Sequence, residues 1–344
     1  MADLLQYQYQ HNRMPNLKKK VTGLGLCSGG LDSILSAMIL QNQGIKVTWI
    51  CFETPFFSSK YAKKASQQTG IPLITCDITK GYIKMMKNPQ AGFGKNMNPC
   101  MDCHALMFAT AGKILTNKGF DFLFSGEVVG QRPKSQNKNS LRYVEKNSGF
   151  DGLVLRPLSA KLLPPTIVEE NGMVDRRKLL DISGRSRKIQ IQMAKTMGVK
   201  EYPSPAGGCL LTDKIFSERL KDLMDNLQST GKKELHLLKH GRHFRLDSAT
   251  KVIVGRSEQD NKNLIQYLNK DKDILLKHGN LPGPDVILSG KTSLHNIKTA
   301  AMILAAYTKS KPGEKTNIKV IKQQNETILS VTTGKISEFK HMMI

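Results

Sequence analysis

Short apolar runs alternate with amphipathic stretches over the first third of the chain. Runs typical of buried strands span 21–27, 46–52, 73–77 and 120–125. Stretches with apolar residues at helical spacing span 33–43, 60–69 and 103–118. A helix-ending glycine follows each of these stretches, at Gly44, Gly70 and Gly119. Alternating strands and helices joined by short turns predict an α/β fold with a doubly wound parallel sheet.

The pattern changes in the second half of the chain. Residues 151–208 are irregular and rich in Pro, Gly, Arg and Lys, with one helix expected at 185–197. A further helix is expected after them, at 213–227. Short β-like runs then span 242–246, 251–255 and 286–289, with helices between them. This texture predicts a second, smaller α+β domain. We expect three parts: a basic lead-in at 1–20, a catalytic domain at 21–228 and a carboxyl-terminal domain at 229–344.

The charge of the chain narrows the choice of partner. Among 344 residues, 52 Lys and Arg stand against 28 Asp and Glu, which gives a net charge of +24. Such an excess favours a polyanion such as nucleic acid, and the ordinary surface of a lysine-rich protein is the alternative. The sequence has no signal-peptide pattern and no apolar stretch of membrane-spanning length, so we expect a cytoplasmic protein with no membrane partner.

Chemistry is expected first in the loop after the first strand, Ser28-Gly-Gly-Leu-Asp-Ser33. Gly29 and Gly30 allow backbone N–H groups to turn towards an anion. Ser28 and Ser33 add hydroxyl donors, and the following helix offers its amino terminus to negative charge. Asp32 needs a cation between its carboxylate and a phosphate, and Mg²⁺ suits that place. The loop therefore predicts a site for a phosphate group with its metal ion.

This loop resembles the signature of the PP-loop, or N-type ATP pyrophosphatase, superfamily. The resemblance implies cleavage of ATP between its α- and β-phosphates, transfer of AMP to a substrate oxygen and release of pyrophosphate. A nucleophile then displaces AMP; it is nitrogen in GMP, argininosuccinate and tRNA-Ile lysidine synthetases, and sulfur in tRNA thiolation enzymes. Ligands of such sheets lie at the carboxyl ends of the strands, where Glu53 and Gly126 complete the expected nucleotide site.

The cysteines bear on which nucleophile is used. Cys100 and Cys103 form a Cys-x-x-Cys pair, and Cys209 lies in a distant Gly-rich loop. A zinc site with His104, a redox pair and three unremarkable thiols are all alternatives. Three thiolates can also hold three corners of a 4Fe–4S cube and leave one iron open to carry hydrosulfide. Buried strand positions are expected for the other three, Cys27, Cys51 and Cys76.

Several tRNA thiolation enzymes have a similar arrangement of cysteines. The resemblance implies a 4Fe–4S cluster on Cys100, Cys103 and Cys209 or, as in other members, a persulfide on one of two cysteines and a resolving thiol, matching Cys103 and Cys209. Residues 124–133 and 155–159 extend the likeness, which runs from about 21 to 213 and includes tRNA 2-thiouridylase-like proteins. The two β-rich domains of the thiouridylases and the THUMP-like domain of 4-thiouridine synthetases have no counterpart in the sequence, so the modified position stays open.

The carboxyl-terminal part resembles the NFACT-R RNA-binding module over 241–261 and 276–288. A phosphate-binding face is expected on its predicted strands, from Arg242, Arg245, Lys251 and Arg256. A solvated basic surface is the alternative.

These features predict an ATP-dependent tRNA sulfurtransferase that makes a thiouridine. Its expected cofactors are ATP, Mg²⁺ and a 4Fe–4S cluster. Its expected partners are tRNA and a sulfur donor, either sulfide or a cysteine desulfurase or persulfide carrier. Asp32, Cys103 and Cys209 are the expected catalytic residues. The alternatives are a PP-loop synthetase that transfers nitrogen to an adenylated small molecule, and an RNA-binding protein with a degenerate ATPase.

Overall fold

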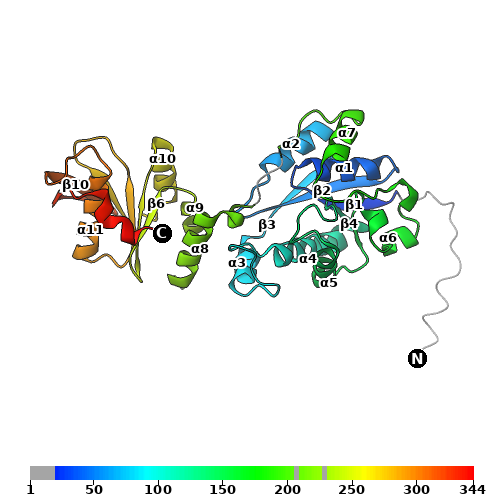
Figure 1. Ribbon diagram of the computed structural model, residues 1–344, viewed down its shortest axis with the longest axis horizontal. Coiled ribbons are helices and arrows are strands. Elements are labelled where there is room, and N and C mark those ends of the chain that lie inside the picture. Colours follow the sequence, from blue (N-terminus) through cyan, green and yellow to red (C-terminus); the bar gives the residue numbers. More distant parts are fainter. Residues whose placement is uncertain (1–19, 205–208, 227–230) are drawn as a thin grey trace, which may run out of the picture. The chain divides into compact units, whose positions relative to one another are not determined.

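The computed structural model describes residues 20–204, 209–226 and 231–344 (Figure 1). The chain divides into two compact units. The first unit comprises the residues up to 52 with 59–76 and 101–205, and the second unit comprises 53–58, 77–100 and 206–344. The division expected at residue 228 stays a prediction.

A five-stranded parallel sheet forms the centre of the first unit, in the order β3-β2-β1-β4-β5. Its strands are β1 (Thr22–Leu26), β2 (Lys46–Glu53), β3 (Leu73–Asp77), β4 (Phe122–Ser125) and β5 (Val154–Leu155). Its helices are α1 (Leu31–Gln41), α2 (Lys60–Thr69), α4 (Cys100–Lys118), α5 (Lys138–Ser148), α6 (Ile167–Glu170) and α7 (Lys188–Thr196). Because β1 pairs in parallel with both β2 and β4, the strand order reverses at β1, and ligands of doubly wound sheets bind at that point.

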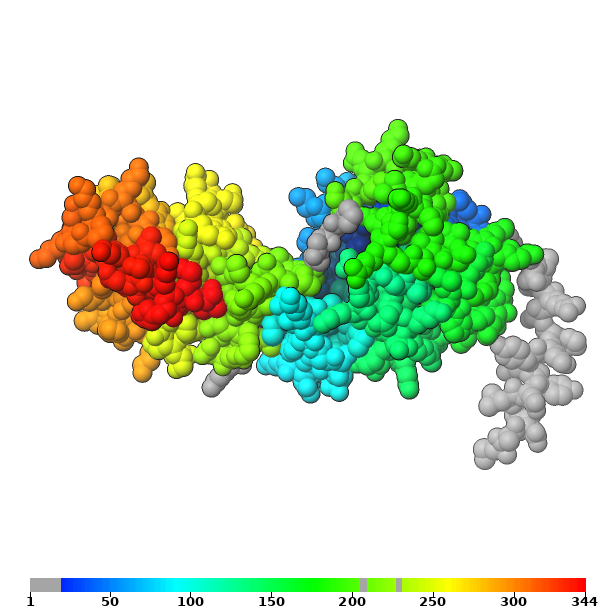
Figure 2. Space-filling view, viewed as in Figure 1, coloured from blue at the N-terminus to red at the C-terminus, as the bar shows by residue number. Residues whose placement is uncertain are grey.

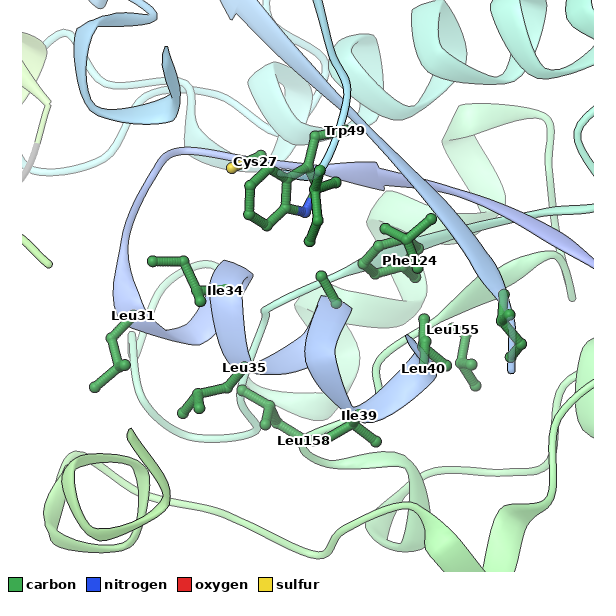
Figure 3. Packing of buried hydrophobic residues seen from close by; sticks show 14 of the residues in the cluster. Cys27, Leu31, Ile34, Leu35, Ile39, Leu40, Trp49, Phe124, Leu155 and Leu158 are labelled. Atoms are coloured by element: carbon green, nitrogen blue, oxygen red, sulfur yellow. The ribbon is translucent and has the colours of Figure 1, made fainter. Parts of the chain in front are cut away.

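The helix after the first strand is buried along most of its length. Figure 3 shows side chains of α1 in the core cluster that also contains Trp49 and Phe124 from the sheet. The fully buried apolar residues of α1 include Leu31, Ile34, Leu35 and Leu40. Burying a side chain of this size contributes roughly 1.5–3 kcal/mol. The core therefore fixes the first turn of α1, and with it the loop that precedes this turn.

The second unit contains a six-stranded antiparallel sheet, in the order β11-β10-β8-β9-β7-β6. The strands are β6 (Arg242–Asp247), β7 (Thr250–Val254), β8 (Ile274–His278), β9 (Val286–Gly290), β10 (Lys315–Lys322) and β11 (Asn325–Thr332). The helices are α3 (Thr79–Lys87), α8 (Lys214–Asn226), α9 (Lys232–Leu237), α10 (Glu258–Tyr267) and α11 (Leu294–Ala306). Buried α11 residues such as Ala301 and Leu304 share one core with Val252 and Leu276, and Leu264 of α10 belongs to a separate cluster with Ile253 and Ile287.

The predicted fold class is confirmed for both parts, a parallel α/β sheet followed by a smaller α+β domain. The strands expected at 46–52 and 73–77 and the helix expected at 60–69 agree with β2, β3 and α2 to within a residue. In the described parts of the chain, no helix has the length and apolar character needed to cross a membrane.

Candidate nucleotide and cysteine site

The Ser28–Ser33 loop takes a shape that only glycine permits at its second position. Gly29 has a φ of 78°, and its N–H donates to the Cys27 sulfur at 3.3 Å. A Cβ at this position would lie 2.2 Å from the carbonyl carbon of Tyr61, in α2. The loop is therefore held against the first turn of α2 with no space for a side chain.

The two serines of the loop have different surroundings. Ser33 is buried, and its hydroxyl donates to the Gly30 carbonyl at 2.7 Å, which closes the turn that begins α1. Ser28 is exposed, and its Oγ accepts from the Gly30 N–H at 3.4 Å. Ser28 is thus better placed than Ser33 to offer a hydroxyl to a phosphate.

Asp32 carries a buried oxygen without a partner. Its Oδ2 accepts from the Gln131 amide at 3.1 Å, whereas Oδ1 is buried and has no hydrogen-bond partner within the described ranges. Burial raises the pKa of Asp32, and the Gln131 amide and Arg187 oppose that rise. An unsatisfied carboxylate oxygen at a helix amino terminus fits a hard cation such as Mg²⁺.

The carboxyl end of β4 touches the first turn of α1. A Cβ at Gly126 would lie 2.5 Å from the Asp32 carbonyl carbon and 2.6 Å from the Ser33 nitrogen. Glycine at 126 therefore allows the strand end and the phosphate loop to meet, as expected for a residue of the nucleotide site. Glu53 ends β2 and is partly exposed.

A buried ionic network follows Gly126, and no sequence pattern indicates its pairings. Glu127 accepts from His104 Nδ1 at 2.8 Å, from Ser125 Oγ at 3.0 Å and from Arg156 Nε at 3.0 Å. Arg156 also donates to Glu145 at 3.0 Å. Burial raises the pKa of Glu127, but Arg156 and His104 outweigh it and lower the pKa to about 2. Glu127 is therefore ionised and joins the ends of β4 and β5 to His104 of α4.

The Cys-x-x-Cys pair lies in the first turn of α4, so Cys100 and Cys103 share one side of the helix. Cys103 is buried, and the Cys100 sulfur accepts from Asn98 Nδ2 at 3.3 Å. Cys209 directly precedes a short 3₁₀ turn, Leu210–Thr212.

Two hydrogen bonds join the segment before Cys100 to the segment after Cys209. Asn96 Nδ2 donates to the Thr212 carbonyl at 2.6 Å, and the Met97 N–H donates to Ser217 Oγ at 3.4 Å. Among the residues that the structure describes, however, no group of three His, Cys, Asp or Glu side chains is arranged to hold a metal ion. The geometry therefore does not support the 4Fe–4S cluster, which stays a prediction from the sequence.

The remaining cysteines are largely buried. Cys27 and Cys51 are buried as expected, whereas the buried position expected for Cys76 is wrong, because Cys76 is partly exposed. Burial raises the pKa of Cys27 to about 11, although Ser33 and the Gly29 N–H lower it in part. Cys27 is therefore a neutral thiol that supports the loop by accepting the Gly29 hydrogen bond.

The four cations expected to bind RNA all have partners within the second unit. The Arg242 guanidinium lies 4.8 Å from the centre of the Tyr307 ring. Arg245 and Lys251 both donate to Asp222 of α8, at 2.7 and 2.8 Å. Arg256 donates to Asp260 at 2.7 Å and stays 45% exposed.

Of these four residues, Lys251 is the least available to bind a phosphate. Burial lowers its pKa to about 8, although Asp222 opposes this change. The expected strands are present. The contacts with Asp222 show, however, that at least Arg245 and Lys251 hold α8 against the sheet. Asp222 lies far from both in the sequence, and no local pattern indicates the pairing.

A doubly wound parallel sheet whose first strand ends in Ser-Gly-Gly-x-Asp-Ser defines a PP-loop ATP pyrophosphatase domain. Residues 19–161 match the profile of the ThiI family, described as thiamine biosynthesis protein (ThiI), and residues 241–343 match the NFACT protein RNA binding domain. The chain thus carries a ThiI-family PP-loop domain followed by an NFACT-R domain, which confirms both resemblances.

Similar solved structures include a 4-thiouridine synthetase bound to RNA and ATP, with 20% identity, a TM-score of 0.37 and coverage of 52% of this chain and 41% of that chain. A protein from Methanocaldococcus jannaschii described as a predicted subunit of tRNA methyltransferase has 15% identity, a TM-score of 0.33 and coverage of 51% and 76%. The C-terminal part of a fibronectin/fibrinogen-binding protein from Streptococcus suis has 14% identity, a TM-score of 0.28 and coverage of 38% and 67%. This chain therefore spans less than half of the 4-thiouridine synthetase. No curated protein matches the chain.

Proposed function

We propose that the protein is an ATP-dependent tRNA sulfurtransferase that converts a uridine into a thiouridine. The observation that carries this proposal is the intact phosphate loop of a ThiI-family domain, with an unsatisfied buried Asp32 oxygen, in one chain with an NFACT-R domain. A degenerate ATPase would have lost this loop. The NFACT-R match favours RNA as the substrate, rather than the small molecule of a nitrogen-transferring synthetase.

In this proposal, the loop residues hold ATP. Gly29 and Gly30 give the loop the shape that receives the phosphates, the Ser28 hydroxyl binds phosphate, and the amino terminus of α1 adds favourable charge. Asp32 Oδ1 binds Mg²⁺, which offsets the negative charge of the phosphates when it is present. Ser33 and Gly126 shape the site, and Glu53 lies at the neighbouring strand end.

The chemistry proceeds in two substitutions. The uridine carbonyl oxygen attacks the α-phosphorus of ATP, and pyrophosphate leaves. A sulfur nucleophile then adds to the activated carbon, and AMP departs with the former uridine oxygen. The protein supplies orientation and charge to both steps, and a base carbonyl is a poor leaving group without this activation.

Cysteine is the proposed carrier of sulfur. Cys103 is the candidate for a persulfide and Cys209 for the thiol that resolves it, and Cys100, Cys103 and Cys209 are the candidate ligands of a 4Fe–4S cluster. Iron analysis and an absorbance spectrum of protein purified without oxygen decide between the persulfide and the cluster. The cluster predicts a brown protein with about four irons per chain for a full cube. Stoichiometric zinc with no iron after anaerobic reconstitution would exclude it.

The function itself is tested with unmodified tRNA, ATP, Mg²⁺ and sulfide under anaerobic conditions. Mass spectrometry of the digested tRNA should detect a thiouridine in the reaction with wild-type protein and none with Asp32→Asn. A reaction that consumes ATP in the presence of tRNA but adds no sulfur, both with sulfide and with a cysteine desulfurase and cysteine as the donor, would contradict the proposal. Supplying a cysteine desulfurase with cysteine in place of sulfide identifies the donor.

A further inference from the structure

His104 of α4 is held by a buried carboxylate through one ring nitrogen, and its other ring nitrogen is unused. Nδ1 lies 2.8 Å from Glu127 Oε1, and Glu127 is held in turn by Arg156 and Ser125. Because Arg156 keeps Glu127 ionised, Glu127 only accepts, and the proton of the neutral imidazole lies on Nδ1. Nε2 has no hydrogen-bond partner among the described residues, and the side chain is 29% exposed. Nε2 therefore offers a lone pair to a donor from outside the chain.

The His104 ring lies where the phosphate loop and the proposed sulfur carrier come together. Glu127, which holds the ring, directly follows Gly126, and a Cβ at Gly126 would lie 2.5 Å from the carbonyl carbon of Asp32 in the loop. On its own helix, His104 directly follows Cys103, and neighbouring Cα atoms are about 3.8 Å apart. The chain from β4 to α7, in shades of green, forms much of the visible surface of the first unit in Figure 2. A base can therefore approach the partly exposed ring from the solvent.

The proposed reaction restricts where the target base can lie. The uracil oxygen attacks the α-phosphorus of ATP at the loop, and the carbon of the same carbonyl receives sulfur delivered at Cys103, as a persulfide or from a cluster. The base must reach both places, and His104 lies beside both. The N3–H group of uracil lies between its two carbonyls, so it is next to the reacting carbonyl whichever of the two is thiolated. Nε2 can accept this N–H, whereas cytosine has a lone pair at N3 and would oppose one acceptor with another.

We propose that His104 recognises the target base, with Nε2 accepting a hydrogen bond from the N3–H group of uracil. Glu127 is the positioning residue, because its bond to Nδ1 fixes both the orientation of the ring and its tautomer. The inference rests on the proposed function for the place of the base, and it deepens that function by naming the residue that selects uracil over cytosine. The imidazole stays neutral in this contact, and no proton is transferred.

Two amide variants separate recognition from structural support. His104→Asn keeps a donor for Glu127 near the position of Nδ1 and removes the acceptor at Nε2, whereas His104→Gln places a carbonyl oxygen near Nε2 and gives up the Glu127 bond. Labelled decauridine and decacytidine are the probes, and fluorescence anisotropy measures their binding to the full chain. Wild type should prefer decauridine by about fivefold or more, the usual effect of one hydrogen bond. The preference should fall below about twofold in His104→Asn and persist in His104→Gln. His295→Asn, at an exposed histidine of α11, is the control and should match wild type.

The thermal midpoint of each variant is measured alongside, and His104→Gln should melt below His104→Asn because it lacks the Glu127 bond. A purely structural role predicts the opposite order in binding, with the preference kept in His104→Asn and lost in His104→Gln, and that result would overturn the inference. So would a wild-type protein without a preference. If His104→Asn does not fold, His104→Ala takes its place and should also lose the preference. The expected binding pattern in a protein that never thiolates tRNA would refute the proposed function and leave the uracil contact standing. Thiolation at the wild-type rate by His104→Asn would refute the contact and leave the function.

Discussion

Asp32 in the first unit and Asp222 in the second unit are both partly buried carboxylates near arginines, but their surroundings differ. Asp32 has one oxygen without a partner among the described residues. Asp222 accepts from both Arg245 and Lys251, and these bonds join α8 to β6 and β7. Unsatisfied groups indicate where a ligand belongs, whereas satisfied groups hold the fold. The comparison predicts that Asp32 controls activity and that the Asp222 pairs control stability.

The largest effect is expected at Asp32. Asp32→Asn should slow pyrophosphate release by a factor of a hundred or more, because a metal ligand at the reacting phosphates is worth on the order of 3 kcal/mol. Burial raises the pKa of Asp32, so the ionised carboxylate costs folding free energy at neutral pH. The variant should therefore melt at the same temperature as wild type or higher. A coupled assay measures the rate of pyrophosphate release, and calorimetry measures the melting temperature. A large fall in both the rate and the melting temperature would contradict the distinction between the two carboxylates.

Asp222 should show the opposite pattern. Asp222→Ala leaves Arg245 and Lys251 partly buried without a counter-charge, so unfolding of the second unit should be easier by about 3 kcal/mol. Asp225→Ala, three residues on and exposed, should change stability by less than about 0.5 kcal/mol. Denaturant titration provides both values. Pyrophosphate release should be unchanged in either variant once it is folded.

Glu127 tests the pH dependence of stability. Its pKa falls from 4.5 to about 2 in the folded chain, so its contribution is present above pH 4.5 and is lost as the pH falls towards 2. Glu127→Gln should destabilise the first unit at pH 7, and its difference from wild type should narrow as the pH falls below 4.5. Urea titrations at pH 7, 5 and 3.5 follow that difference. A constant difference across this range would mean that the charge of Glu127 does not stabilise the fold.

The smallest effects are expected for single cations of the NFACT-R domain. Arg256 is half exposed, so Arg256→Ala should weaken tRNA binding and reduce the salt slope by up to about 0.9 log unit per log unit of salt. Arg245→Ala should lower stability and leave the slope unchanged, because Asp222 already binds Arg245. Fluorescence anisotropy with labelled tRNA at several salt concentrations measures the salt slope of each variant. Equal slopes for both variants would place the RNA on other residues.

The parts of the molecule that the sequence predicted are local ones. The loop from Ser28 to Ser33 is readable because one strand, two glycines and one helix start follow each other directly. The sequence does not predict helix α11. Its own side chains are apolar on most sides, Ala and Leu among them, so they leave no amphipathic period. The Glu127 network and the Asp222 pairs join residues that are 23 to 29 positions apart, and pairings over that distance depend on the folded topology.

The cysteines show the same limit. The sequence identified Cys100 and Cys103 by their spacing, and α4 places them in one turn as that spacing requires. Their relation to Cys209 depends on segments far apart in the chain, and spacing cannot supply it.

The central claim is that AMP is transferred to the uridine carbonyl oxygen, and the fate of that oxygen tests it most directly. A tRNA transcribed with ¹⁸O in the uracil carbonyls is incubated with the protein, ATP, Mg²⁺ and sulfide, and the AMP formed is weighed by mass spectrometry. The account predicts one ¹⁸O in the phosphate of AMP for each thiouridine formed. AMP without the label, or ADP and phosphate in place of AMP and pyrophosphate, would contradict it.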